Sequence, residues 1–139
     1  MKKLLFILSL VLFAGFISRA QDEANDKIRD KMTEYIQKRL RLTQNEAEKF
    51  SPVFVRYFTE WRQTLKDNRE DVLVRQQRIA ELRIRYRNEF RDIVGEKRSN
   101  DVFRKQEEFI QGLQKMREEQ IRSKRDDRPN KRFRSLIQQ

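Results

Sequence analysis

Apolar side chains recur along this chain every three or four residues, in stripes too narrow to enclose a thick core. This spacing places them on one face of an α-helix. The stripes predict four helices, at residues 26–41, 47–65, 72–93 and 102–121. Because runs of β-branched residues are absent and glycine and proline are scarce, nothing in the sequence favours strands. We therefore expect an all-α fold of four long amphipathic helices.

Two local signals mark the start of the second helix. Thr43 and Glu46 have the spacing of a capping box, in which each side chain accepts a hydrogen bond from a free backbone N–H. Pro52 falls inside the same helix, where its missing N–H removes one backbone hydrogen bond. We expect Pro52 to bend the helix at that point.

Further signals divide the second half of the chain. Gly95 is suited to end the third helix, and the polar residues 96–100 predict a loop with Ser99 or Asn100 as the next N-cap. After Ser123 the apolar pattern stops. Residues 124–139 are rich in arginine and lysine and predict a basic, disordered tail, which leaves residues 21–123 as the helical domain.

The first twenty residues have the pattern of a secretion signal. Lys2 and Lys3 precede an uncharged, mostly apolar run at residues 4–17, and Ser18 and Ala20 supply the small side chains that signal peptidase requires. A membrane anchor is the alternative, but the run is shorter than the about 20 apolar residues of a spanning helix. No cysteine is present to carry a lipid. We expect cleavage after Ala20 and release of a soluble protein into the periplasm.

The residue types present favour binding over catalysis. The chain has no histidine and no cysteine, so the commonest general base, nucleophile and soft metal ligands are missing. Its three glycines are isolated, so no phosphate-binding loop can be drawn. We expect no enzyme, no catalytic residue, no metal site, no cofactor and no small-molecule substrate.

The charge of the exported chain is strongly positive and carried mainly by arginine. Without the three basic residues of the leader, 30 basic and 22 acidic residues remain, a net charge of +8. The densest cluster lies in the third predicted helix and comprises Arg75, Arg78, Arg83, Arg85, Arg87 and Arg91. It forms either a solvated helix face or a cationic binding face. Nucleic acid is the usual partner of so basic a protein, but export argues against it and favours acidic lipids or acidic protein clients.

The second helix concentrates aromatic residues on one face: Phe50, Phe54, Tyr57, Phe58 and Trp61. A core facing the other helices is the favoured interpretation. Because four thin helices leave part of such a stripe uncovered, the alternative is an open surface at a dimer seam or a client-binding face.

The segment around the second helix start resembles a known family. The run Leu42-Thr43-Gln44-Asn45-Glu46 is similar to the Leu-Thr-x-x-Gln motif of the periplasmic Spy/CpxP family. The likeness is greatest to a small branch described as sensors of extracytoplasmic-function sigma factors, whose pattern extends to Ala47, Phe50, Pro52 and Val53. Glu46 departs from the motif's final glutamine, and the missing histidines depart from metal-sensing relatives.

The resemblance implies a cradle-like, often dimeric four-helix fold that acts in the envelope stress response. Our leading hypothesis is a Spy-like, ATP-independent chaperone that binds unfolded or acidic protein clients. The alternative is a CpxP-like regulator that docks on a membrane signalling partner, either a sensor kinase or an anti-sigma factor. A Skp-like trimeric chaperone is a weaker third hypothesis, because the sequence offers no strands for its β core.

Overall fold

The computed structural model describes the backbone of residues 2–137 and the side chains of residues 21–125. Within that backbone the chain forms four helices and no strand: α1 (Lys2–Arg39), α2 (Gln44–Asp67), α3 (Val72–Val94) and α4 (Glu96–Ile137). The expected all-α fold is confirmed.

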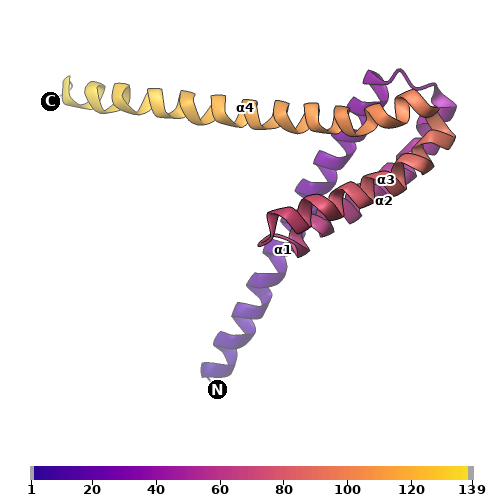
Figure 1. Ribbon diagram of the computed structural model, residues 1–139. Coiled ribbons are helices and arrows are strands. Elements are labelled where there is room, and N and C mark those ends of the chain that lie inside the picture. The colour runs from indigo at the N-terminus through magenta and orange to yellow at the C-terminus, as the bar shows by residue number, and fades with distance from the viewer. Residues whose placement is uncertain (1, 138–139) are drawn as a thin grey trace.

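The helices are joined by short turns into a hairpin-like arrangement (Figure 1). α2 and α3 form an antiparallel hairpin. Two ion pairs join these helices, one between Arg56 and Glu89 and one between Glu60 and Arg85. α4 turns back along α3, and α1 packs against both α2 and α4. The outer ends of α1 and α4 extend past the hairpin in different directions (Figure 1). The homodimer stays a prediction.

The predicted leader lies in the first half of α1, whose backbone is one continuous helix from Lys2. The side chains of residues 1–20 lie outside the described residues, so cleavage after Ala20 stays a prediction. Among the residues that the structure describes, no helix has an apolar stretch long enough to cross a membrane.

A tight turn connects α1 to α2 and places Leu42 and Thr43 at the start of α2. Arg41 takes a left-handed conformation with φ of 52°, the usual position for the residue that ends a helix. The N–H of Leu42 bonds the Gln37 carbonyl at 3.0 Å, and the N–H of Arg41 bonds the Lys38 carbonyl at 3.2 Å. This is a Schellman motif, after which Leu42 packs on the core and Thr43 begins the next helix.

The connection from α3 to α4 is shorter than the sequence predicts. Gly95 ends α3 with a positive φ of 85°, and α4 begins at the next residue, so the loop expected at residues 96–100 is wrong. Gly95 alone makes the turn because it lacks the Cβ that disfavours positive φ. Ser99 is an interior helical residue and not an N-cap: its N–H bonds the Gly95 carbonyl at 3.0 Å and its hydroxyl bonds the Glu96 carbonyl at 2.7 Å. Asn100 likewise bonds the Glu96 carbonyl.

The end of α4 also differs from expectation. Its backbone continues to Ile137 without a break at Ser123, where the sequence predicts the tail to begin. Six of residues 124–137 are lysine or arginine, which favour a helix, whereas Pro129 disfavours one. The side chains of residues 126–139 lie outside the described residues.

The core is a single aromatic and aliphatic cluster shared by all four helices. Its buried apolar members are Met32, Ile36, Leu40, Phe50, Phe54, Tyr57, Phe58, Leu82, Tyr86, Phe90, Val94 and Val102. They all lie between residues 32 and 102, so the core occupies the half of the molecule near the two turns described above. Beyond it α1 and α4 leave the α2–α3 hairpin (Figure 1).

Candidate interaction surfaces

The capping box at the start of α2 is confirmed and extends further than predicted. The Glu46 N–H donates to the Thr43 hydroxyl at 3.2 Å, and the Thr43 N–H donates to the Glu46 carboxylate at 3.0 Å. The same carboxylate accepts two hydrogen bonds from Arg98 of α4, at 2.9 and 2.5 Å. Arg98 also bonds the carbonyl of Val94 at the end of α3. One acidic side chain thus connects the starts of α2 and α4.

A carboxylate, rather than an amide, at position 46 has a physical reason in this contact. A guanidinium and a carboxylate form two parallel charge-assisted hydrogen bonds, whereas a glutamine amide can accept through only one atom. The hydrogen bond from Arg98 is the main cause that lowers the pKa of Glu46 below its usual range, and the bond from the Thr43 backbone adds to it. The chain therefore keeps this pair ionised at neutral pH.

Substituting Glu46→Gln tests the pair through its pH dependence. Because the folded-state pKa of Glu46 lies below the unfolded value of 4.5, the carboxylate stabilises the fold above pH 4.5. That contribution is lost as the pH falls through the folded pKa. We expect Glu46→Gln to unfold at lower urea concentration than the wild type at pH 7, with the difference shrinking below pH 4.5. A difference that stays constant down to pH 3 in circular-dichroism titrations would show that the charge of Glu46 does not matter.

The aromatic stripe of α2 lies in the core and not on an open face. Phe50, Phe54 and Tyr57 are fully buried and Phe58 is 3% exposed, while Trp61 is partly buried against the cluster. The structure therefore agrees with the core interpretation and leaves little of this stripe for a client. Pro52 lies in the same helix on its exposed side, and the bend expected there stays a prediction.

The predicted cationic face of α3 is divided in two by the helix geometry. At 3.6 residues per turn, Arg78 and Arg85 lie on one side of the buried Leu82, and Arg83 and Arg87 lie on the other. Arg75 is placed at the helix start, where its guanidinium bonds carbonyls of the α2–α3 turn. The five arginines therefore form no single surface.

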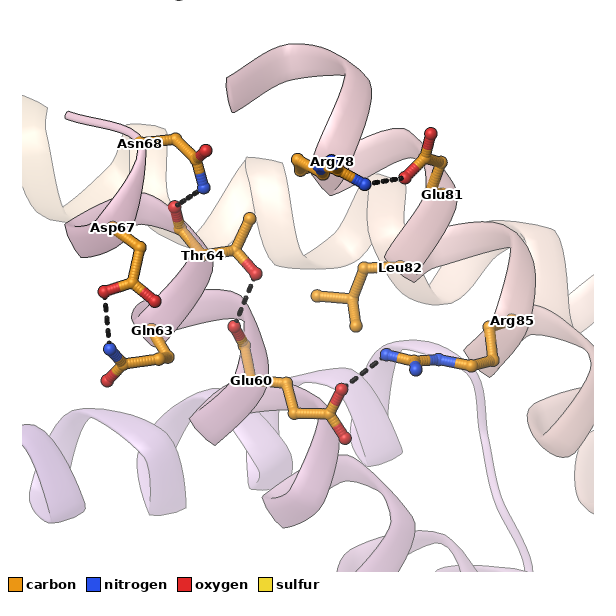
Figure 2. Close-up of a pocket in the computed structure, with 9 residues that line it drawn as sticks. All are labelled: Glu60, Gln63, Thr64, Asp67, Asn68, Arg78, Glu81, Leu82 and Arg85. Atoms are coloured by element: carbon orange, nitrogen blue, oxygen red, sulfur yellow. Dashed lines mark hydrogen bonds and ion pairs between the residues drawn. The ribbon is translucent and has the colours of Figure 1, made fainter. Parts of the chain in front are cut away.

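The side formed by Arg78 and Arg85 faces α2 across a polar cavity of about 490 Å³ (Figure 2). Arg85 is paired with Glu60 of α2, and Arg78 is paired with Glu81 of its own helix at 3.2 Å. Glu60 also accepts a hydrogen bond from the Tyr86 hydroxyl at 2.6 Å. Burial, and then this bond with Glu60, raises the pKa of Tyr86 to about 12, so the phenol stays protonated at neutral pH. The arginines and two of the carboxylates that line this cavity are paired with one another. We therefore interpret the cavity as part of the contact between α2 and α3.

The other side is partly buried and contributes to the core. The Arg83 guanidinium lies over the ring of Phe103, 5.6 Å from its centroid, and bonds Glu107 of α4 at 2.9 Å. Beside it, the buried Tyr57 hydroxyl donates to Gln106 at 2.6 Å. Burial raises the pKa of Tyr57, which Arg83 and the bond to Gln106 partly offset. Arg83 is therefore a structural residue.

The apolar residues that do reach solvent were missed by the sequence reasoning. Seven large hydrophobic residues are exposed among the described side chains, and four of them lie on α3: Val72, Leu73, Val74 and Ile84. Leu73 is 76% exposed and Ile84 is 55% exposed. We call these four residues the α3 surface, in which Leu73 and Ile84 share one side of the helix and Val72 and Val74 flank Leu73. The available signal was the consecutive apolar run directly after the Asp71 N-cap, since three residues in a row cannot all face one side of a helix.

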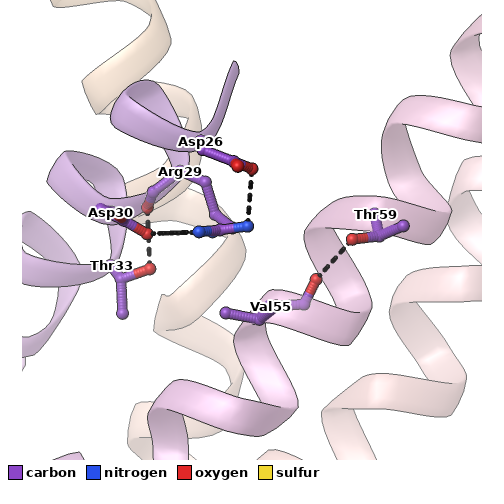
Figure 3. Close-up of polar contacts among 6 residues, drawn as sticks. All are labelled: Asp26, Arg29, Asp30, Thr33, Val55 and Thr59. Carbon is purple, nitrogen blue, oxygen red and sulfur yellow. Dashed lines mark hydrogen bonds and ion pairs between the residues drawn. The ribbon is translucent and has the colours of Figure 1, made fainter. Parts of the chain in front are cut away.

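A second apolar feature is a groove where α1 and α2 diverge, which we call the α1/α2 groove. It encloses about 950 Å³ and is lined by residues 21–29 of α1, by residues 58–66 of α2 and by Arg69 of the α2–α3 turn. Its apolar lining includes Phe58, Trp61 and Leu65. At its α1 side Arg29 bridges Asp26 and Asp30 and reaches toward α2, where Figure 3 shows Val55 and Thr59.

Three cations lie on the side of the groove formed by α2 and the turn that follows it. They are Arg62, Lys66 and Arg69, and none of them has a carboxylate partner among residues 21–125. The α1 wall instead carries Asp22 and Asp26. The groove therefore combines apolar side chains with walls of opposite charge.

Among the residues that the structure describes, no three acidic side chains gather closely enough to hold a metal ion. Comparison with known proteins adds no assignment: no family model, no curated protein and no solved structure matches the chain.

Proposed function

We propose that this protein is a periplasmic, non-enzymatic stress-response protein that binds unfolded or acidic protein clients without nucleotide. The observation that carries the proposal is the concentration of exposed hydrophobic residues on α3, a helix that also carries six arginines. An unfolded chain exposes apolar side chains together with carboxylates. The α3 surface and its neighbouring cations offer contacts for both.

Two further points support this function. The resemblance of Leu42, Thr43 and the start of α2 to the Spy/CpxP family favours an envelope protein that works by binding alone. Arg87, which has no carboxylate partner among the described residues, lies three residues beyond Ile84 on the same helix, so a carboxylate near a bound apolar segment has a cation within reach.

Removing the exposed apolar side chains of α3 tests the proposal. We expect the double substitution Leu73→Asp with Ile84→Asp to lower the suppression of aggregation of chemically denatured malate dehydrogenase by about tenfold in effective concentration. Both residues are exposed, so the helix content should not change. Light scattering measures the suppression and circular dichroism the helix content.

The matched control is Gln76→Asp with Asn88→Asp, which adds the same charge to exposed polar positions of the same helix. This control should keep most of the suppression. If the wild type suppresses no aggregation at equimolar protein and at any ionic strength, the chaperone function is wrong.

The regulatory alternative uses the same surface and predicts a different partner. A photo-crosslinker placed at Leu73 in living cells should trap many clients if the protein is a chaperone. One stoichiometric membrane protein trapped there would assign the α3 surface to a sensor kinase or an anti-sigma factor instead.

A further inference from the structure

Positive charge is concentrated at the end of the chain. Residues 114–137 of α4, which we call the α4 arm, hold nine basic and four acidic residues, a net charge of +5. Residues 21–113 hold 21 basic and 18 acidic residues, a net charge of +3. More than half of the positive charge that follows residue 20 therefore lies in this one helical segment.

The α4 arm lies outside the core. Its backbone is helical to Ile137, and Figure 1 shows it as a rod that leads away from α2 and α3. Its described side chains, at residues 114–125, are all exposed, and none forms an ion pair with another described residue. Because helices in proteins are stabilised mainly by packing of one face, a bound surface would stabilise the arm.

One side of the arm combines cations with an apolar side chain. Arg117, Ile121 and Lys124 follow one another at steps of four and three residues, so they lie on the same side of the helix. Ile121 is 52% exposed. Of the two acidic residues nearby, Glu119 lies on the opposite side and Glu118 on the flank. This side is therefore free of acidic side chains among residues 114–125.

The surface of a bilayer with acidic lipids matches this arrangement. The arm is about 36 Å long at 1.5 Å per residue and carries cations along its length. An extended anionic surface can contact such a row, whereas a single carboxylate can contact only one or two cations. Arginine and lysine reach lipid headgroups while their stems stay in the interface, and an isoleucine between them can enter the acyl boundary.

We propose that the α4 arm docks on the surface of a bilayer that contains acidic phospholipids, with Arg117, Ile121 and Lys124 toward the lipid. Each arginine or lysine near such a surface strengthens binding about fivefold, and salt screens this attraction. The α3 surface belongs to another helix, so the proposal is independent of client binding.

Vesicle binding by residues 21–139 tests the proposal. The probe is vesicles of phosphatidylcholine with about one third phosphatidylglycerol at about 50 mM salt, and co-sedimentation measures binding. We expect binding to these vesicles, release at about 500 mM salt and no binding to pure phosphatidylcholine. The arm variant Arg117→Gln, Lys124→Gln and Arg125→Gln should bind at least about tenfold more weakly.

The control variant is Lys31→Gln with Lys49→Gln and Lys97→Gln, which removes the same charge from exposed positions outside the arm. It should bind nearly as the wild type does. The arm variant should also keep its helix content and its suppression of client aggregation, which separates this proposal from the chaperone function. A wild type that does not bind acidic vesicles, or a control that weakens binding as much as the arm variant, overturns the proposal.

A single fluorophore identifies the part of the protein that contacts the lipid. Because the chain has no cysteine, Ile121→Cys and Leu73→Cys each create one labelling site. A polarity-sensitive dye at position 121 should shift to the blue on acidic vesicles, and the dye at position 73 should not. A shift at position 73 alone contradicts docking through the arm. Tighter binding to a short DNA duplex at the same salt, weakened by the arm variant, would overturn the lipid assignment in favour of nucleic acid.

Discussion

Substituting Phe90→Ala is expected to lower the free energy of unfolding by about 3–5 kcal/mol, the range for deleting a buried phenylalanine ring. Phe90 is fully buried on α3 at the centre of the aromatic cluster. Five other rings lie with their centroids 5.1–6.4 Å from its own, those of Phe50, Phe54, Tyr57, Tyr86 and Phe103. These neighbours belong to α2, α3 and α4, so the cavity would be shared by three helices.

Urea denaturation followed by circular dichroism at fixed protein concentration measures this effect. Ile84→Ala is the control on the same helix, because its side chain is 55% exposed and its truncation should change the unfolding free energy by less than about 0.5 kcal/mol. A loss below about 1 kcal/mol for Phe90→Ala would mean that the surrounding rings close over the cavity.

The elements that the sequence predicts well are those with a local physical cause. The capping box at Thr43 and Glu46, the end of α3 at Gly95 and the buried face of α2 each depend on side chains a few residues apart. Glycine, however, can take a positive φ with more than one ψ, so its presence alone does not tell how soon the next helix begins. This is why the expected loop at residues 96–100 is wrong although Gly95 is placed correctly.

Contacts between distant residues could not be predicted from one sequence. The sequence predicts a loop at Arg98, and nothing local indicates that this side chain meets Glu46, 52 residues away. The arginines of α3 looked alike in the sequence. Helix geometry separates Arg85, paired with α2, from Arg83, which packs on α4. A charge cluster within one helix therefore does not establish a shared surface, because neighbouring helices on each side take up its members.

The second large effect concerns the buried polar pair between α2 and α4. The Tyr57 hydroxyl donates to Gln106 at 2.6 Å, and both residues are fully buried. Replacing Gln106→Leu leaves the hydroxyl without this acceptor in the core, and an unsatisfied buried polar group costs about 1–3 kcal/mol. We expect that loss in the free energy of unfolding, measured by urea denaturation.

The double variant Tyr57→Phe with Gln106→Leu should recover most of this loss, because it removes donor and acceptor together. The Gln106 side-chain nitrogen is one of two buried polar atoms without a partner among the described residues, the other being Nε of Arg83. Gln106→Leu also removes the unpaired side-chain nitrogen of Gln106 from the core. This gain offsets the about 0.5–1.5 kcal/mol that the lost hydrogen bond contributes to stability. We therefore expect the double variant to lie within about 1 kcal/mol of the wild type, with a coupling energy of about 0.5–3 kcal/mol between the two sites.

That outcome would give the pair a role other than stability. Tyr57 and Gln106 meet in only one register of α2 against α4, so a polar pair that adds little net free energy still disfavours other registers. Arg83 reinforces the same register through its bond to Glu107. If instead the losses from Tyr57→Phe and Gln106→Leu simply added in the double variant, the two side chains would act independently, and this pair would not select the register of α4.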